Sequence, residues 1–322
     1  MTDILDTLIP VPTVSGGENE LREKIYRYIK KYTDEIHTDV LGNLIATRAA
    51  VPQKGKKPLK IAFFCAIDAP GRIVTYLEDN GLVRTSPIGK TDLKATAYTK
   101  VVKAGDSKCT GILVPGSFKL GKDDLSEPLF ADFGFENAEK AARHIAVGDL
   151  LCFAEEPVRP SDKIVYAPAL GNKLCAAALA KLAALTEPAA YELSFVFCAQ
   201  SVLGSRGAAP AAFGISPDIA VCLEPYEESE SLGVRMADRF SVGDSELIKE
   251  LQNAAAQTGT TLTPSISSDS FTDAARVNGA GHGARIATLL YPVHAKGLPR
   301  ERADLSLCKT LADVLIRLTQ NL

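Results

Sequence analysis

The sequence has almost no excess charge and no long apolar run, and each absence excludes a class of protein. Its 322 residues carry 36 Lys and Arg against 39 Asp and Glu, a formal net charge of −3. This balance does not provide the basic surface that binds nucleic acid. No apolar run reaches the roughly 18 to 20 residues that cross a bilayer, and the Ala-rich stretch 176–184 is interrupted by Lys181. We expect neither a nucleic-acid partner nor a membrane protein.

The chain also lacks the marks of secretion. Its first ten residues include Asp3 and Asp6 and do not have the basic-then-apolar order of a signal peptide. The seven cysteines are odd in number, show no CxxC spacing, and mostly lie in apolar, strand-like runs. This usage is typical of reduced core thiols. We therefore expect a cytoplasmic protein.

Two regions with an α/β pattern flank one of different texture. Residues 17–34 show helical spacing of apolar side chains, and the apolar run 59–68 predicts a central strand. The α/β pattern returns after residue 165. Helices are predicted over 174–185, from the Asp244 cap to residue 257, and from residue 304 onward. Strands are predicted over 191–199, 218–223 and 285–291. Residues 69–165 instead alternate short β-like pieces with Gly, Pro and Asp turns. We predict an α/β domain formed by 1–68 plus 166–322, interrupted by a small β-barrel domain at 69–165.

The predicted strand ends carry a further signal, because ligands of α/β sheets collect there. They read Ala66-Ile67-Asp68, Ala199-Gln200-Ser201-Val202, Leu223-Glu224-Pro225 and Tyr291-Pro292-Val293-His294. Their order and spacing resemble the glutamyl-aminopeptidase, or tetrahedral, family of dinuclear metalloaminopeptidases, whose relatives have been labelled endoglucanases. Segments 39–46, 129–134, 204–208 and 272–274 match the family in the same order over most of the chain. The resemblance implies a three-layer, mixed-sheet α/β domain of the zinc-exopeptidase type with an inserted β-barrel that mediates homo-oligomerisation.

The resemblance also implies a metal site. In the family, two zinc or cobalt ions are held by two histidines, a bridging aspartate, a glutamate and another aspartate, and a second glutamate is the general base. The metals acidify the bridging water, and the unligated carboxylate takes its proton. Carried onto this sequence, the general-base position is Ser201, the family's supporting aspartate is Asp68, and the ligand positions are Ala66, Gly171, Val202, Glu224 and His294. Of these five positions only Glu224 and His294 could ligate a metal.

These departures lead to two hypotheses. The first is a homologue that has lost most metal ligands and the general base, is inactive or very weak, needs no cofactor, and serves as a scaffold for a partner, a peptide or a small carboxylate. Lys173 and Arg206 would then replace part of the metal charge and hold a carboxylate ligand. The alternative is an active aminopeptidase that removes N-terminal residues through a rearranged site, in which Glu224, His294 and Asp68 hold one zinc or cobalt ion. The residues alone leave open whether the protein is an enzyme.

Overall fold

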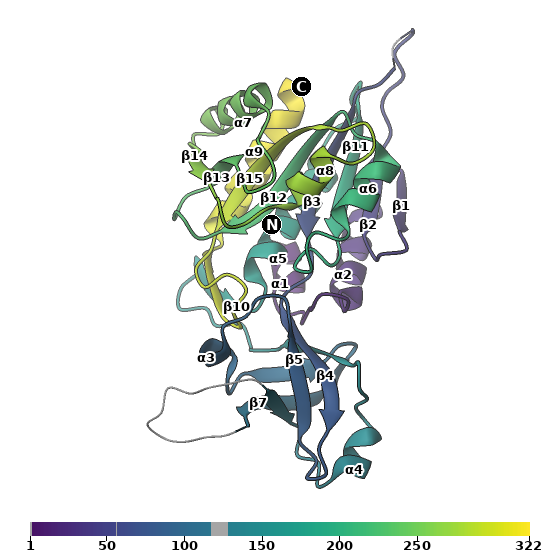
Figure 1. Ribbon diagram of the computed structural model, residues 1–322. Helices are drawn as coiled ribbons and strands as arrows, with labels where there is room; N and C mark the ends of the chain where they lie inside the picture. The colour runs from purple at the N-terminus through teal and green to yellow at the C-terminus, as the bar shows by residue number, and fades with distance from the viewer. Residues whose placement is uncertain (1, 56, 117–127) are drawn as a thin grey trace.

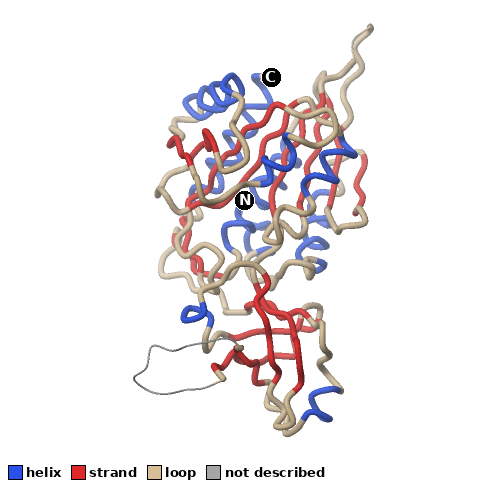
Figure 2. The backbone as a smooth tube through the Cα atoms, viewed as in Figure 1, coloured by secondary structure: helices blue, strands red, loops and turns tan. Residues whose placement is uncertain are grey.

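The computed structural model describes residues 2–55, 57–116 and 128–322. It shows a helix-covered β-sheet at one end of an elongated molecule and a β-barrel at the other (Figure 1). Figure 2 shows the same division, with the strands of the barrel gathered below those of the sheet. The chain leaves the sheet after residue 66, forms the barrel, and returns to the sheet at residue 192.

The central sheet is mixed and has the strand order β1-β2-β11-β3-β12-β15-β13-β14. Its inner strands β11, β3, β12 and β15 run parallel, whereas β2 and β13 pair with this core in the antiparallel direction. The inner strands are almost wholly buried, as expected for a sheet covered on both faces. In sequence order the strands are β1 (Glu35–Thr38), β2 (Leu44–Arg48), β3 (Lys60–Ala66), β11 (Glu192–Cys198), β12 (Ile219–Tyr226), β13 (Gly233–Ala237), β14 (Thr263–Ile266) and β15 (Arg285–Pro292).

Helices cover the two faces of this sheet and complete a three-layer sandwich (Figure 1). Successive side chains of β3 alternate between the layers: Phe63 packs in the core on one side, and Phe64 in the core on the other. The larger layer contains α1 (Thr2–Leu8), α2 (Asn19–Ile29), α5 (Leu170–Leu185), α7 (Ser245–Gln257) and α9 (Ser306–Asn321). The smaller layer contains α6 (Ala208–Ile215) and α8 (Asp273–Asn278).

The β-barrel is closed, with the strand order β4-β5-β8-β7-β6-β9. Apolar side chains such as Val83, Val101 and Leu113 fill its interior. Its elements are β4 (Gly71–Leu77), β5 (Val83–Ile88), α3 (Leu93–Thr96), β6 (Lys100–Lys103), β7 (Asp106–Pro115), β8 (Leu129–Asp132), α4 (Ala138–Ala142) and β9 (Leu150–Phe153). Between barrel and sheet, β10 (Ile164–Ala167) pairs with β16 (Glu301–Asp304).

The predicted fold class is confirmed: the α/β sandwich is three-layered, its sheet is mixed, and the chain inserts a barrel. All barrel strands fall within the 69–165 segment. The seven cysteines have free thiols, and six of them are buried. Among the described residues, none of the helices combines the length and the apolar character of a membrane span.

Candidate functional site

A pocket of about 730 Å³ opens where the parallel strands β3 and β12 end. The loops that follow β11 and β15 and the segment before α8 complete its walls. Its lining is rich in acidic side chains and includes two lysines: the charged residues are Lys90, Asp92, Glu224, Glu227, Asp269, Asp273, Lys296 and Glu301. This is the strand-end position at which ligands of open α/β sheets bind.

Glu224 and Asp273 form the acidic floor of the pocket. The backbone N–H of Asp273 donates to Oε1 of Glu224 at 3.0 Å, and the hydroxyl of Ser201 donates to Oδ2 of Asp273 at 3.0 Å. Burial raises the pKa of Glu224 to about 7, and the negative charge of Asp273 adds to this shift. Burial also raises the pKa of Asp273, while the hydroxyls of Ser205 and Ser201 oppose the shift. Ser201, which the sequence analysis expects at the general-base position, thus donates a hydrogen bond to a neighbouring carboxylate.

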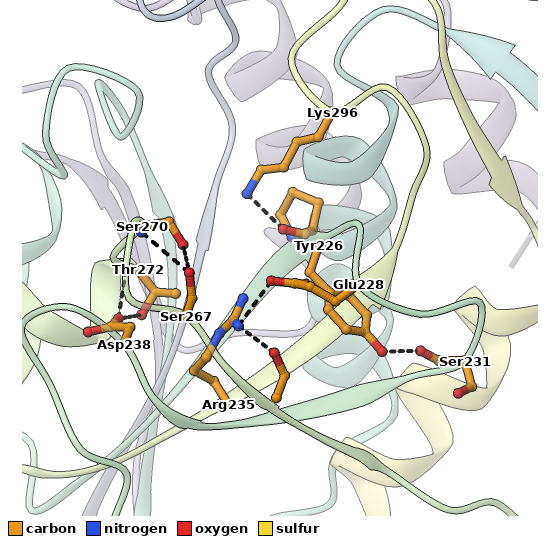
Figure 3. A network of polar contacts seen from close by, with 11 residues as sticks. Tyr226, Glu228, Ser231, Arg235, Asp238, Ser267, Ser270, Thr272 and Lys296 are labelled. Atoms are coloured by element: carbon orange, nitrogen blue, oxygen red, sulfur yellow. Dashed lines mark hydrogen bonds and ion pairs between the residues drawn. The ribbon is translucent and has the colours of Figure 1, made fainter.

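Lys296 brings a positive charge to this floor. Its ammonium group donates to the backbone carbonyl of Pro225 at 2.7 Å, directly after Glu224 in the chain (Figure 3). Its charge lowers the pKa of both Glu224 and Asp273, against the effect of burial. Glu301 lies nearby and accepts the backbone N–H groups of Gly171 and Gly297 at 2.7 and 2.6 Å. Lys296 therefore supplies part of the positive charge that a bound cation would bring to these carboxyls.

Asp68 lies behind the pocket wall and shapes it indirectly. Its carboxylate is fully buried, and Oδ2 accepts the backbone N–H of Val202 at 2.9 Å. Burial raises the pKa of Asp68 to about 7, against the effect of this N–H, and the charge of Glu18 raises it further. Asp68 therefore positions the loop that carries Ser201 and Val202.

The residues at the other positions expected to be ligands do not provide side chains for a pair of dications. Ala66 and Val202 line the pocket without a ligating side chain. A Cβ at Gly171 would overlap the Cβ of Pro225 and lie 3.1 Å from Cγ1 of Val293, so a longer side chain has no room there. Within the described ranges, no group of three or more His, Cys, Asp or Glu residues could hold a metal ion.

The structure does not bring His294 to Glu224, in contrast to the grouping expected for one metal ion. Nε2 of His294 lies 2.6 Å from Oε1 of Glu230, and its side chain is 45% exposed. The backbone of His294 pairs with that of Arg302, and His294 is not among the described residues that line the pocket. Oε1 of Glu224 instead accepts the N–H of Asp273. Glu224, His294 and Asp68 thus have three different sets of partners.

Lys173 and Arg206 also lie away from the positions expected of pocket cations. Lys173 is 1% exposed, and its ammonium group donates to the carbonyls of Ile9 and Pro168 at 2.8 and 2.9 Å. Burial lowers the pKa of Lys173 to about 7. Arg206 is exposed, and its Nε donates to the carbonyl of Leu203 within the same loop. Both cations order the backbone and do not line the pocket.

Sequence reasoning missed the residues that do charge the pocket, namely Lys296, Asp273 and Glu301. Lys296 lies only two residues beyond His294, on the turn after β15, but a lone lysine in a loop has no recognisable motif. Asp273 lies in the matching segment 272–274, and an acidic residue at the start of a helix was its one local signal.

This strand-end pocket in a three-layer sandwich with an inserted barrel defines a class of aminopeptidase-like α/β proteins. The sequence model of the M42 glutamyl aminopeptidase family matches residues 42–313, and the chain belongs to this family. A protein named "Putative aminopeptidase" from Acetivibrio thermocellus is 28% identical over 319 residues, which cover 95% of this chain and 94% of the relative.

Two solved structures share the fold. Aminopeptidase APDkam598 from the archaeon Desulfurococcus kamchatkensis superimposes with a TM-score of 0.90 at 21% identity, over 98% of this chain and 93% of that one. The TET1 peptidase of Pyrococcus horikoshii, described as assembling into a tetrahedron or a large octahedral shell, gives 0.82 at 21% identity and covers 98% of both chains. These likenesses establish the fold.

Proposed function

We propose that this M42 family member is catalytically inactive, or very weak, and that it keeps the family pocket as a ligand-binding scaffold. The observation that carries the proposal is the packing of Gly171 against Pro225, which fills the space that a bridging carboxylate would need. A bridging carboxylate holds the two dications together, and its absence removes the basis of the dinuclear centre.

The residue at the general-base position supports the same conclusion. Ser201 is a hydroxyl that donates to Asp273, and an unassisted hydroxyl does not take a proton from water near neutral pH. Loss of a general base alone typically lowers the rate by about two to four orders of magnitude. Together with the missing ligands, this leaves the positions expected to form the family's site without a group that activates water.

The open pocket supports a binding role. Its volume of about 730 Å³ lies in the range of small-molecule sites, and its lining combines charged and apolar side chains. We also propose that the protein forms a homo-oligomer, since the Pyrococcus horikoshii peptidase of the same fold assembles into closed shells. The seven free thiols support a reducing compartment such as the cytoplasm.

Metal content and turnover test this proposal together. The purified full chain is incubated with zinc or cobalt, desalted, analysed for bound metal, and assayed on a panel of aminoacyl anilides with the metal added. We expect substoichiometric metal and no release of product above that of a heat-inactivated sample. Stoichiometric metal with turnover that is abolished in Glu224→Gln, but kept in the surface variant Glu139→Gln, would refute the proposal. Sedimentation velocity on the same sample tests for the homo-oligomer.

A further inference from the structure

We propose that the pocket binds an aliphatic di- or polyamine through its ammonium groups. This inference rests on the proposed function, because it requires a pocket without dications. Among the described residues that line the pocket, six are acidic and two are basic, so the lining is complementary to a cation. The acids form two sets: Glu224, Asp273 and Glu301 at the floor, and the exposed residues Asp92, Glu227 and Asp269 at the rim.

An unpartnered buried oxygen points to a ligand at the floor. Asp273 is 1% exposed and lines the pocket, yet its Oδ1 has no hydrogen-bond partner among the described residues. A buried carboxylate oxygen without a donor is costly, and a positively charged donor satisfies both its charge and its lone pairs. An ammonium group carries three such donors in a compact head.

Lys296 shows how an ammonium group fits this floor. Its Nζ reaches the backbone carbonyl of Pro225, the residue that follows Glu224 in the chain, at 2.7 Å. Lys296 sets one chain-borne ammonium against three floor acids, Glu224, Asp273 and Glu301. A second ammonium, supplied by a ligand, would complete the balance.

The walls favour an organic amine over a bare metal ion. The lining also includes apolar side chains, namely Ala66, Ala69, Pro70, Val202, Phe271 and Leu298. A methylene chain packs against such walls while its two ends reach acids, whereas a dication needs several ligands at one point. No described group of three acidic, His or Cys side chains provides that point. The chemistry therefore selects an aliphatic chain with an ammonium group at each end.

Calorimetric titration of the metal-free full chain at about pH 8, where both carboxyls and amines are charged, tests this inference. The probes are 1,4-diaminobutane, n-butylamine, 4-aminobutanoate and zinc chloride. We expect one diamine per chain, with n-butylamine binding at least about tenfold more weakly because it cannot reach both sets of acids. No binding of the diamine, or tighter binding of 4-aminobutanoate or zinc, would overturn the proposal.

Two variants with opposite expected effects place the binding in this pocket. Glu224→Gln should weaken diamine binding about tenfold or more, and Lys296→Met should strengthen it about tenfold because a competing ammonium is removed. Glu139→Gln, on the barrel surface, should bind as the parent does. A folding defect can weaken binding but cannot strengthen it, and unchanged binding in both pocket variants would refute the assignment. If the protein neither binds amines nor hydrolyses peptides, this inference alone is overturned. If it shows metal-dependent turnover, the proposed function is overturned.

Discussion

Gly171 packs so closely on Pro225 that a Cβ at position 171 would overlap the Cβ of the proline and lie 3.1 Å from its Cγ. Gly171 is the second residue of α5, and its N–H donates to Oε2 of Glu301 at 2.7 Å. Pro225 lies on β12, which α5 covers. The first turn of α5 is therefore held against the end of β12. This contact leaves no room at position 171 for a longer side chain that would enter the pocket.

This packing predicts that Gly171→Ala lowers the free energy of unfolding by about 1–3 kcal/mol, as overpacking of a tight core does. Gly171→Asp should destabilise at least as much and should not restore metal binding. Denaturant unfolding measures both variants. The control is Gly214→Ala on α6, where a Cβ meets no neighbour and a gain of about 0.5–1 kcal/mol is expected from helix propensity. A stable Gly171→Asp variant with stoichiometric zinc would contradict the packing argument.

The sheet could be predicted from sequence because its inner strands are continuous apolar runs. The run 59–68 contains β3, and the predicted strand 285–291 is one residue shorter than β15. Asp244 caps α7 as predicted, accepting the N–H of Leu247 at 2.8 Å. The outer strands β13 and β14 were missed, since each is only four or five residues long and pairs with a distant segment.

The pocket was harder to predict than the sheet. Ala66, Val202 and Glu224 follow strand ends in the sequence and line one pocket, because parallel strands end at one edge. Loops have no hydrophobic periodicity from which the directions of their side chains could be predicted. For this reason the sequence analysis expects His294 in the pocket and does not expect Lys296 there. Lys173 was expected to face a ligand, but the backbone carbonyls that bind it come from segments distant in sequence or from a local turn.

The buried hydrogen bonds of Lys173 predict that its replacement lowers the stability of the protein strongly and leaves the pocket unchanged. In Lys173→Met the carbonyls of Ile9 and Pro168 lose their buried donor, and we expect a loss of about 2 kcal/mol in the free energy of unfolding. The matched control is Lys181→Met on the same helix, where the lysine is only partly buried and the change should be within about 0.5 kcal/mol. Thermal or denaturant unfolding distinguishes the two. Equal stability of both variants would show that the hydrogen bonds of Lys173 add nothing.

The raised pKa of Asp68 predicts a specific dependence of stability on pH. Its pKa is about 7 in the folded protein and 3.8 for the ordinary group, so between these values the folded state binds more protons than the unfolded state. Its contribution to stability is therefore greatest at low pH and falls as the pH rises through this window, by up to about 1.4 kcal/mol per pH unit. Asp68→Asn removes this term.

We therefore expect the stability of Asp68→Asn relative to the parent to improve steadily from about pH 4 to pH 7 and to level off above it. Urea midpoints across this range measure the difference, which cancels the titration of groups that do not interact with Asp68. Asp313→Asn, at a surface ion pair on α9, is the control and should give a nearly flat difference. A flat difference for Asp68→Asn as well would mean that the folded protein keeps this carboxyl at its ordinary pKa.

Replacement of His294 tests whether the histidine that the sequence analysis expects as a metal ligand has a role in the pocket. Its imidazole is half exposed and paired with the exposed Glu230, and such surface pairs contribute about 0–1 kcal/mol. His294→Ala should therefore change stability by less than about 1 kcal/mol and leave both metal content and diamine affinity at parent values. His37→Ala, at an exposed position on the edge strand β1, is the matched histidine control. Metal analysis, calorimetry and unfolding are measured on both variants. If His294→Ala alone removes a bound zinc or cobalt ion, this histidine turns into the pocket when metal binds, and the scaffold assignment fails with it.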